Sequence, residues 1–278
     1  MDKKNILYIV IPCYNEEAVI RETARQVAVK MQQLYEKELI SEKSKVLFVD
    51  DGSKDMTWPM IEALHAENPM YAGVKLSRNK GHQNALVAGL STAVKYADMI
   101  VSMDADLQDD INAIDGFVQK YYEGCEVVYG VRSARKTDTF FKKFTAQGFY
   151  KLMMMMGVDI VYNHADYRLM SKRAVEEMLK FKEVNLFLRG IVPLVGFKSD
   201  SVYYERAERF AGESKYPLKK MLAFAMDGIT SFSIKPIRLI TTLGFLIFVI
   251  SLGMLVYSLV RHFTGHTSIG WSSMFVSI

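Results

Sequence analysis

The first half of the chain alternates short apolar runs with amphipathic stretches, which is the pattern of a βαβ series. Ile6–Ile11 is a continuous apolar run, as expected of a parallel strand that is buried on both faces. The same pattern predicts more strands and several helices. The further strands are Val46–Val49, a weaker one at Val74–Leu76, Met99–Met103 and Val127–Val131, and the helices are Glu17–Leu39, Gln83–Tyr96 and Thr139–Met156.

Polar clusters follow four of these strands directly. They are CYNEE after the first strand, DDGSKD after the second, SRNKGHQN after the third and DADLQDD after the fourth. Open α/β sheets bind their ligands in the crevice beyond the carboxyl ends of the strands. The pattern therefore predicts an α/β domain with a ligand site at that edge of the sheet.

The C-terminal region has a different character. Leu239–Val260 is a run of 22 residues without a charge, which as a helix would span roughly 33 Å and cross the hydrocarbon core of a bilayer. More basic residues precede this run than follow it, which predicts a cytoplasmic N-terminal domain by the positive-inside rule. The basic residues before it are Lys219, Lys220, Lys235 and Arg238, and Arg261 follows it.

Two apolar segments flank the predicted membrane span. Tyr216–Ile234 has apolar residues at roughly helical spacing, so it is predicted either to lie in the membrane interface or to pack on the catalytic domain. Trp271–Ile278 resembles the opening of a second membrane segment that is cut short. The predicted organisation is a catalytic domain over 1–215, a juxtamembrane segment over 216–235 and a membrane region over 236–278, with the second span starting from about 271.

The composition of the chain argues against some classes of function and location. The formal net charge is +4 and the basic residues form no dense clusters, so the sequence gives no case for nucleic acid as a partner. Cys13 and Cys125 are the two cysteines and lack metal-ligand spacing, which suits a reducing compartment. The apolar run that ends at Pro12 is too short for the core of a secretory signal.

The acidic pair Asp104 and Asp106 is the central candidate for chemistry. Residues two apart on an extended segment point the same way, so both carboxylates can face one ligand. Magnesium typically takes one or two carboxylates together with substrate phosphates. Asp104 and Asp106 follow a buried strand, and Gln108 offers a further oxygen, so the segment is a candidate metal site.

Asp50 and Asp51 end the second predicted strand and precede Gly52 and Ser53. One interpretation is a turn followed by a helix cap. The other is that a carboxylate at the strand end accepts hydrogen bonds from a nucleobase or a ribose. The residues alone leave both interpretations open.

Seven motifs occur in an order that resembles one enzyme family. VIPCYNEE, VDDGSKD, NKGHQNALVAGL and DADLQDD are followed by DYRLMS at 166–171, ERFAGESKY at 208–216 and GITSFSIKPIRL at 228–239. Together they resemble the polyprenyl-phosphate glycosyltransferases of glycosyltransferase family two, which include dolichyl-phosphate mannose synthase and the bacterial bactoprenol glucosyltransferases. The resemblance covers essentially the whole chain and fits the bacterial branch better, although the second membrane helix of that branch is incomplete here.

The resemblance implies a GT-A fold, with a mostly parallel sheet, and assigns roles residue by residue. Asp166 would lie at the reaction centre and Arg132 would bind the acceptor phosphate, with Lys143 as a second basic residue there. The nucleotide pocket would be lined by Pro12, Tyr14 and Glu16, with Asp50 at the base. Asp104, Asp106 and Gln108 would hold Mg²⁺ or Mn²⁺ and the diphosphate, and Arg209, Ser214 and Lys215 would belong to a loop that closes over it.

Two charged residues near these motifs have structural interpretations as well. Arg168 is as readily the partner of a structural ion pair as a ligand contact. His82 is interpreted as a cap of the helix that begins near Gln83, rather than as a catalytic group.

The function that the resemblance implies is inverting transfer of a hexose from a UDP-sugar to undecaprenyl or another polyprenyl phosphate at the cytoplasmic membrane face. The product would donate its sugar to a later glycosylation of the cell envelope, and relatives suggest a homo-oligomer. UDP-glucose and UDP-N-acetylglucosamine are the leading donors. The alternatives are a processive polysaccharide synthase, disfavoured because neither Trp58 nor Trp271 follows a Gln-x-x-Arg pattern, and a non-catalytic membrane scaffold that binds nucleotide sugars.

Overall fold

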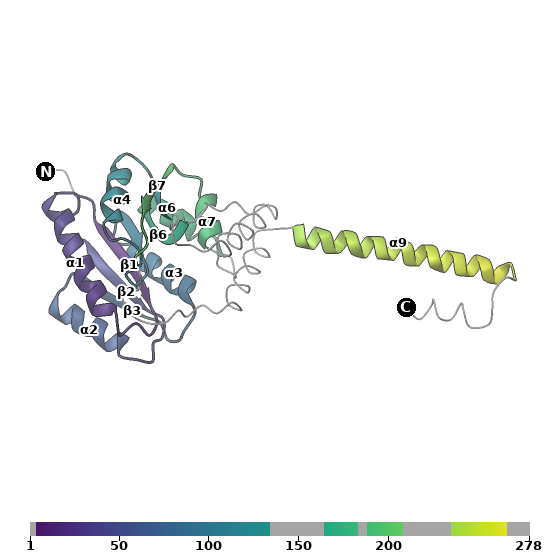
Figure 1. Cartoon of the computed structure of the whole chain (residues 1–278), viewed down its shortest axis with the longest axis horizontal. Coiled ribbons are helices and arrows are strands. Elements are labelled where there is room, and N and C mark those ends of the chain that lie inside the picture. The colour runs from purple at the N-terminus through teal and green to yellow at the C-terminus, as the bar shows by residue number, and fades with distance from the viewer. Residues whose placement is uncertain (1–3, 134–163, 183–187, 208–234, 266–278) are drawn as a thin grey trace. The chain divides into compact units, whose positions relative to one another are not determined.

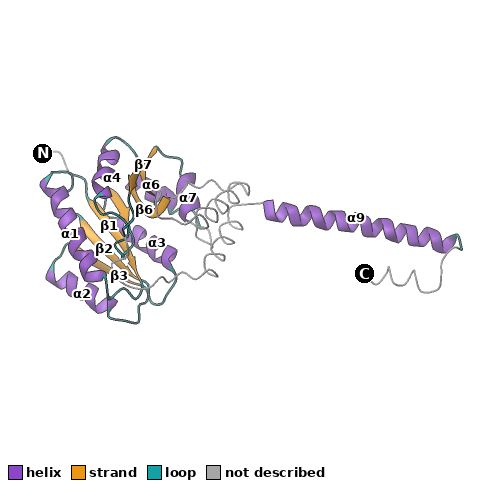
Figure 2. Ribbon diagram, viewed as in Figure 1, coloured by secondary structure: helices purple, strands orange, loops and turns teal. Residues whose placement is uncertain are grey.

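The chain forms two compact units, Met1–Ser231 and Phe232–Ile278. The computed structural model describes residues 4–133, 164–182, 188–207 and 235–265 (Figure 1). The first unit holds one sheet with helices on both faces (Figure 2). The second contains the long helix α9.

The sheet has seven strands in the order β3-β2-β1-β4-β6-β5-β7. Strands β3, β2, β1 and β4 run parallel to one another, and β7 runs parallel to β5. Strand β6 is antiparallel to both of its neighbours, β4 and β5. The strands are β1 Leu7–Cys13, β2 Lys45–Asp50, β3 Tyr71–Lys75, β4 Met99–Ser102, β5 Val127–Arg132, β6 His164–Ser171 and β7 Ser199–Tyr204.

Helices cover both faces of the sheet, as its apolar strands require. Helices α1, α2 and α4 lie on one face, and α3, α6 and α7 on the other (Figure 1). Alternate residues of β1 pack against the helices on opposite faces of the sheet. Ile9 and Ile11 join the core under α1, whereas Val10 packs against α3 at Gly89. The helices are α1 Ile20–Glu36, α2 Thr57–Glu67, α3 His82–Ala93, α4 Ala113–Tyr122, α6 Lys172–Met178 and α7 Leu188–Leu194.

The antiparallel strand β6 decides which residues meet at the site. Its register with β4 pairs Ser102 with Arg168 at the last matched position. Continued by two residues, this register sets Asp104 level with Asp166. The Ser102 hydroxyl donates to the Asp166 carbonyl at 2.7 Å, which fixes the two strands at this point.

The structure confirms the predicted α/β fold and the first strands, with shifted boundaries. The first helix begins at Ile20 rather than Glu17, because Glu17 lies in the preceding turn, where its carboxylate accepts from the Met56 N–H. The edge strand β3 is Tyr71–Lys75 instead of Val74–Leu76. The predicted helix 139–156 and the segments 216–234 and 271–278 lie outside the described residues.

Several elements were not anticipated from the sequence. Val127–Val131 was expected to continue the sheet, and it does so as part of β5, with β6 between it and β4. Helix α2 has Pro59 in its first turn, where proline is tolerated because that N–H has no partner within the helix. The unanticipated elements are α2, α4, β6, α6, α7 and β7.

Helix α9, Lys235–Phe263, contains the predicted apolar run. Within Ile237–Phe263, an 18-residue window has a mean hydropathy of 2.5, and none of that window is buried within the chain. A helix of 27 residues is long enough to cross a bilayer. Within the described part of the chain it is the single candidate for a membrane span.

Gly89 provides a test of the packing between α3 and the sheet. A Cβ at this position would collide with Val10 Cγ1 and would lie 2.8 Å from Val49 Cγ2. We expect Gly89→Ala to destabilise the catalytic unit by about 1–3 kcal/mol through overpacking, which lowers Tm by about 2–4 °C per kcal/mol in a unit of this size. Ser91→Ala, at a half-buried position of the same helix, is the control and should leave Tm nearly unchanged. An unchanged Tm in Gly89→Ala would contradict this packing.

Candidate active site

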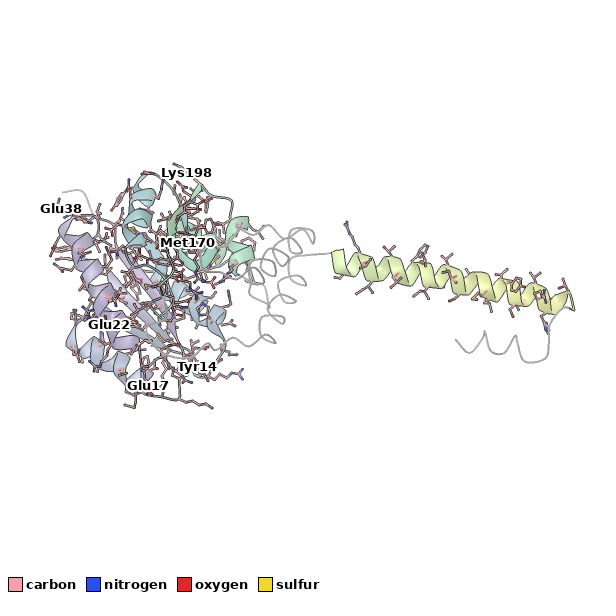
Figure 3. All side chains as sticks on the ribbon, in the orientation of Figure 1. Tyr14, Glu17, Glu22, Glu38, Met170 and Lys198 are labelled. Carbon is pink, nitrogen blue, oxygen red and sulfur yellow. The ribbon has the colours of Figure 1, made fainter. Side chains whose placement is uncertain are left out.

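The loops after β1 and β2 are fastened to each other at the carboxyl edge of the sheet. The Asn15 N–H donates to Ser53 Oγ at 2.9 Å, and its side-chain oxygen accepts from the Lys54 N–H at 2.9 Å. The Glu16 N–H donates to Thr57 Oγ1 at 2.8 Å. Figure 3 shows Tyr14 and Glu17 at this end of the sheet, and Glu38 and Lys198 at the opposite end.

Asp50 is fully buried at the end of β2. Its Oδ1 accepts from the Ser53 N–H at 3.2 Å. Its Oδ2 has no hydrogen-bond partner among the described residues, although buried polar atoms are normally paired. The residue therefore serves the turn with one oxygen and has unused acceptor capacity in the other.

Asp51 has a structural role. Its two oxygens accept from the N–H groups of Lys80 and Gly81 at 2.7 and 2.9 Å, which ties the second loop to the start of α3. Gly52 has φ +70°, and a Cβ there would lie 2.7 Å from the backbone of Arg78. The short segment DDG thus fixes the entry into α3.

Asp104 follows β4 in the midst of other acidic groups. Burial, together with the charges of Asp109, Asp166 and Asp106, raises its pKa to about 6 against the effect of the nearby His82. A carboxylate with this pKa lacks compensating positive charge, which a bound cation would supply. The described residues contain no group of three or more His, Cys, Asp or Glu that could hold a metal alone.

Gln108 does not present a ready metal ligand. Its Oε1 accepts a hydrogen bond from Arg206 Nη2, so a guanidinium lies at the atom that was predicted to bind the cation. The Gln108 N–H donates to Asp106 Oδ1 at 3.1 Å. The metal role of Gln108 stays a prediction, whereas its contact with the segment after β7 is a structural observation.

Asp166, on β6, is held by two arginines. Arg168 Nη2 donates to Oδ1 at 2.6 Å, and Arg189 donates through Nε to Oδ1 at 3.3 Å and through Nη2 to Oδ2 at 3.2 Å. Burial alone would raise the pKa of Asp166, but Arg189, Arg168 and His82 outweigh it and hold the pKa well below its usual range. This carboxylate is therefore an anion at neutral pH.

Arg168 is a structural partner, which resolves the alternative left open by the sequence. Its side chain is 2% exposed, and Nε and Nη1 have no hydrogen-bond partner among the described residues. A guanidinium buried this far beneath Asp166 is not accessible to a ligand.

His82 was predicted to cap α3, and this prediction was wrong. Gly81 is the N-cap residue, with φ +87°, and no side chain caps the helix. The His82 ring lies between two carboxylates instead, with Nε2 3.6 Å from Asp104 Oδ1 and 3.9 Å from Asp166 Oδ2. It therefore connects the candidate metal site with the candidate reaction centre.

Arg132, at the end of β5, is anchored by a buried pair of side chains. Its Nη2 and Nε donate to Asp109 Oδ1 at 3.0 and 3.2 Å, and Tyr204 OH donates to the same oxygen at 2.6 Å. The neighbouring negative charge keeps the Arg132 pKa above its usual value despite burial. The Arg132 side chain is still 22% exposed, so it is held firmly at the rim of the site.

The structure thus brings together most of the predicted site residues that it describes. Asp50, Asp104, Asp106 and Asp166 follow or lie on strands at one edge of the sheet, and Pro12 is buried within β1. Sequence reasoning missed Arg189 and Tyr204, which only long-range pairing brings to the site, and it missed the pairing of Asp109, from the DADLQDD segment, with Arg132. The predicted residues Lys143, Arg209, Ser214 and Lys215 lie outside the described residues.

Comparison with known proteins agrees with this geometry. The profile of "Glycosyl transferase family 2" matches residues 8–179. The chain is 55% identical over 273 residues to "Uncharacterized glycosyltransferase YkoT" of Bacillus subtilis, covering 98% of this chain and 81% of that protein. It is 38% identical over 275 residues to "Prophage bactoprenol glucosyl transferase homolog" of Escherichia coli, covering 97% and 86%.

A solved structure shares the fold. The glucosyl-3-phosphoglycerate synthase of Mycobacterium tuberculosis, crystallised with Mn²⁺, UDP and phosphoglyceric acid, superposes with a TM-score of 0.50 at 15% identity. The match covers 82% of this chain and 77% of that chain.

Proposed function

The chain belongs to glycosyl transferase family 2, and from this premise we propose that it transfers a hexose from a UDP-sugar to a polyprenyl phosphate at the cytoplasmic face of a membrane. The sheet and its helices form the GT-A fold. Glycosyl transfer follows from the family, and the acceptor, the donor and the membrane face are the proposal.

One observation carries the choice of acceptor. The family profile ends at residue 179, but the likeness to the E. coli bactoprenol glucosyl transferase homologue covers 97% of the chain. It therefore extends through the apolar helix α9 as well as the catalytic unit. A polyprenyl phosphate is confined to the bilayer, so a membrane helix on the enzyme raises the effective concentration of this acceptor near the active site.

The charges around α9 support the proposed membrane face. Lys235 and Arg238 lie at its N-terminal end and Arg261 at its C-terminal end, with Lys219 and Lys220 further upstream. This excess of basic residues before the helix supports a cytoplasmic catalytic unit. UDP-sugars are soluble cytoplasmic metabolites, so the donor would be available on that side.

The donor would occupy the carboxyl edge of the sheet. The unpaired Oδ2 of buried Asp50 suits a donor N–H or hydroxyl of a nucleobase or a ribose, and the loop of Tyr14 and Glu16 lies beside it. UDP-glucose and UDP-N-acetylglucosamine are the proposed donors. The loop residues Arg209, Ser214 and Lys215 are proposed to close over the diphosphate on the strength of the resemblance alone.

The residues around Asp104 fit a divalent metal ion, Mg²⁺ or Mn²⁺. Asp104 and Asp106 supply hard oxygen atoms at a strand end, and burial followed by the charges of neighbouring carboxylates raises the pKa of Asp104. Two carboxylates plus substrate phosphates are a common magnesium ligand set. When bound, the ion would neutralise the charge that develops on the departing UDP.

The acceptor needs little help as a nucleophile. The second ionisation of a phosphate monoester lies near pH 6, so its oxygen is largely anionic at neutral pH. Asp166 is saturated by arginine hydrogen bonds and is a poor proton acceptor. We therefore assign Asp166 an electrostatic and orienting role at the sugar rather than that of a general base. A single in-line displacement would invert the anomeric centre.

Arg132 would bind the acceptor phosphate, with Lys143 as a second basic contact. Bidentate arginine–phosphate contacts combine charge with fixed geometry. Asp109 and Tyr204 hold the Arg132 side chain from behind, which leaves its exposed portion at the rim of the site.

The proposed function is tested by incubating the full chain with undecaprenyl phosphate, Mg²⁺ or Mn²⁺ and a panel of nucleotide sugars. Mass spectrometry of the lipid fraction should show a polyprenyl-phosphate hexose with a UDP-sugar, most readily UDP-glucose or UDP-N-acetylglucosamine. A protein that binds UDP but glycosylates no lipid would favour the scaffold alternative. A polymeric glycan as product would favour a processive synthase.

Loss of either metal carboxylate should abolish transfer. Removal of an outer-shell partner of a metal typically lowers metal affinity or activity 10–100-fold. Asp104 and Asp106 are proposed to bind the metal directly, so we expect Asp104→Ala and Asp106→Ala to lower kcat by at least about 100-fold with Tm little changed. Excess EDTA should have the same effect, and added Mg²⁺ or Mn²⁺ should reverse it. Asp110→Ala is the control, because that carboxylate accepts only local hydrogen bonds from Asn112. Full activity in EDTA would rule out a metal role.

Arg132→Ala should raise KM for polyprenyl phosphate by about tenfold or more, while KM for the UDP-sugar changes by less than about threefold. Arg132→Lys should stay clearly impaired, because an ammonium cannot copy the bidentate contact. The paired variant Arg132→Met with Asp109→Asn controls for a buried carboxylate left without its partner. Recovery of the acceptor KM in that pair, or weakened UDP binding in Arg132→Ala, would show that Arg132 has another role.

A further inference from the structure

Three elements that are distant in sequence meet at Asp166. The carboxylate comes from β6, Arg189 from α7 and His82 from the first turn of α3. Helix α7 is also fastened to α3, because the Leu188 N–H donates to Gln83 Oε1 at 3.2 Å. Leu188, Ile191 and Val192 of α7 are buried. The Arg189 guanidinium is therefore presented to Asp166 from a packed helix.

The two arginines restrain Asp166 differently. Arg168 lies two residues along the same strand and reaches only Oδ1, at 2.6 Å. Arg189 spans the carboxylate, with Nε on Oδ1 and Nη2 on Oδ2. Among the described residues it is the one side chain within hydrogen-bond distance of Oδ2.

The second oxygen matters because the terminal torsion of an aspartate is soft. Rotation about the bond between an sp³ and an sp² carbon has broad minima, so one hydrogen bond leaves the plane of a carboxylate free to turn. A guanidinium that donates to both oxygens fixes that plane. Oδ2 is also the oxygen that faces His82, 3.9 Å away, and beyond it Asp104.

We propose that Arg189 is a positioning residue, which fixes the plane of the Asp166 carboxylate toward the sugar and so sets the rate of transfer rather than the affinity for the donor. This inference rests on the proposed function, in which Asp166 acts at the reaction centre. Arg189 is itself 29% exposed, so the rival explanation is direct contact with a substrate.

The first test separates turnover from binding. Arg189→Ala should lower kcat by about tenfold or more, while KM for the UDP-sugar and the affinity for UDP with Mn²⁺ change by less than about twofold. Arg189→Lys should restore only part of kcat, because one ammonium can contact either oxygen but cannot hold the plane. Arg173→Ala, an exposed arginine paired with Glu126, is the matched control and should behave as the wild type. Equal losses in kcat and in UDP affinity would indicate a merely structural role.

The second test asks whether Arg189 acts through Asp166. In an Asp166→Asn background, Arg189→Ala should change kcat by less than about threefold, because the carboxylate it positions is gone. A full tenfold loss in that background would mean that Arg189 contacts a substrate itself, which overturns the proposal. Should Asp166→Asn leave no measurable turnover, the first test decides: an unchanged kcat in Arg189→Ala, or a kcat in Arg189→Lys no higher than in Arg189→Ala, overturns it.

The two proposals fail in distinguishable ways. A wild-type protein that transfers no sugar to any polyprenyl phosphate overturns the proposed function and, with it, the role of Arg189. An active wild type in which Arg189→Ala turns over normally overturns the positioning role alone.

Discussion

Carboxylates crowd together at the carboxyl edge of the sheet, and the arrangement of the site depends on how their charges are balanced. Two like charges 4 Å apart repel by about 4 kcal/mol at an effective dielectric constant of 20. Asp109 is matched by Arg132, and Asp166 by Arg168 and Arg189. The Asp109–Arg132 and Asp166–Arg189 pairs each join segments 23 residues apart in sequence, so these two contacts balance charge and also hold the site together.

Positive charge is shared unevenly among the carboxylates, and this difference gives neighbouring carboxylates different roles. The pKa of Asp166 is held low by arginines, whereas that of Asp104 is raised to about 6 by burial and neighbouring carboxylates, against the effect of His82. Carboxylates whose surroundings shift their pKa values apart commonly have different tasks. Here Asp166 is a fixed anion, and the surroundings of Asp104 favour a cation. His82 connects the two, 3.6 Å from Asp104 and 3.9 Å from Asp166.

About half of the candidate site was accessible from the sequence, and the reason is local. Asp50, Asp104 and Asp106 could be found because each follows an apolar run, and parallel strands end at the same edge. The interpretation of His82 as a helix cap failed because local position suggested a backbone role, whereas its neighbours come from β4 and β6. Arg189 had no local signal. Its seven-residue helix is too short for periodicity to reveal, and its partner precedes it by 23 residues.

By itself the sequence determined the βαβ series, the polar strand ends and the apolar span that became α9, because each depends on the spacing of residues close along the chain. Only the tertiary structure decided that β6 enters between β4 and β5, antiparallel to both. That insertion sets Asp166 level with Asp104 and brings Arg189 across from α7. Strand order is a long-range property, because it depends on which hydrogen-bonding edges and apolar faces meet once the chain is compact. The local sequence pattern of a strand does not show which strands will pair with it.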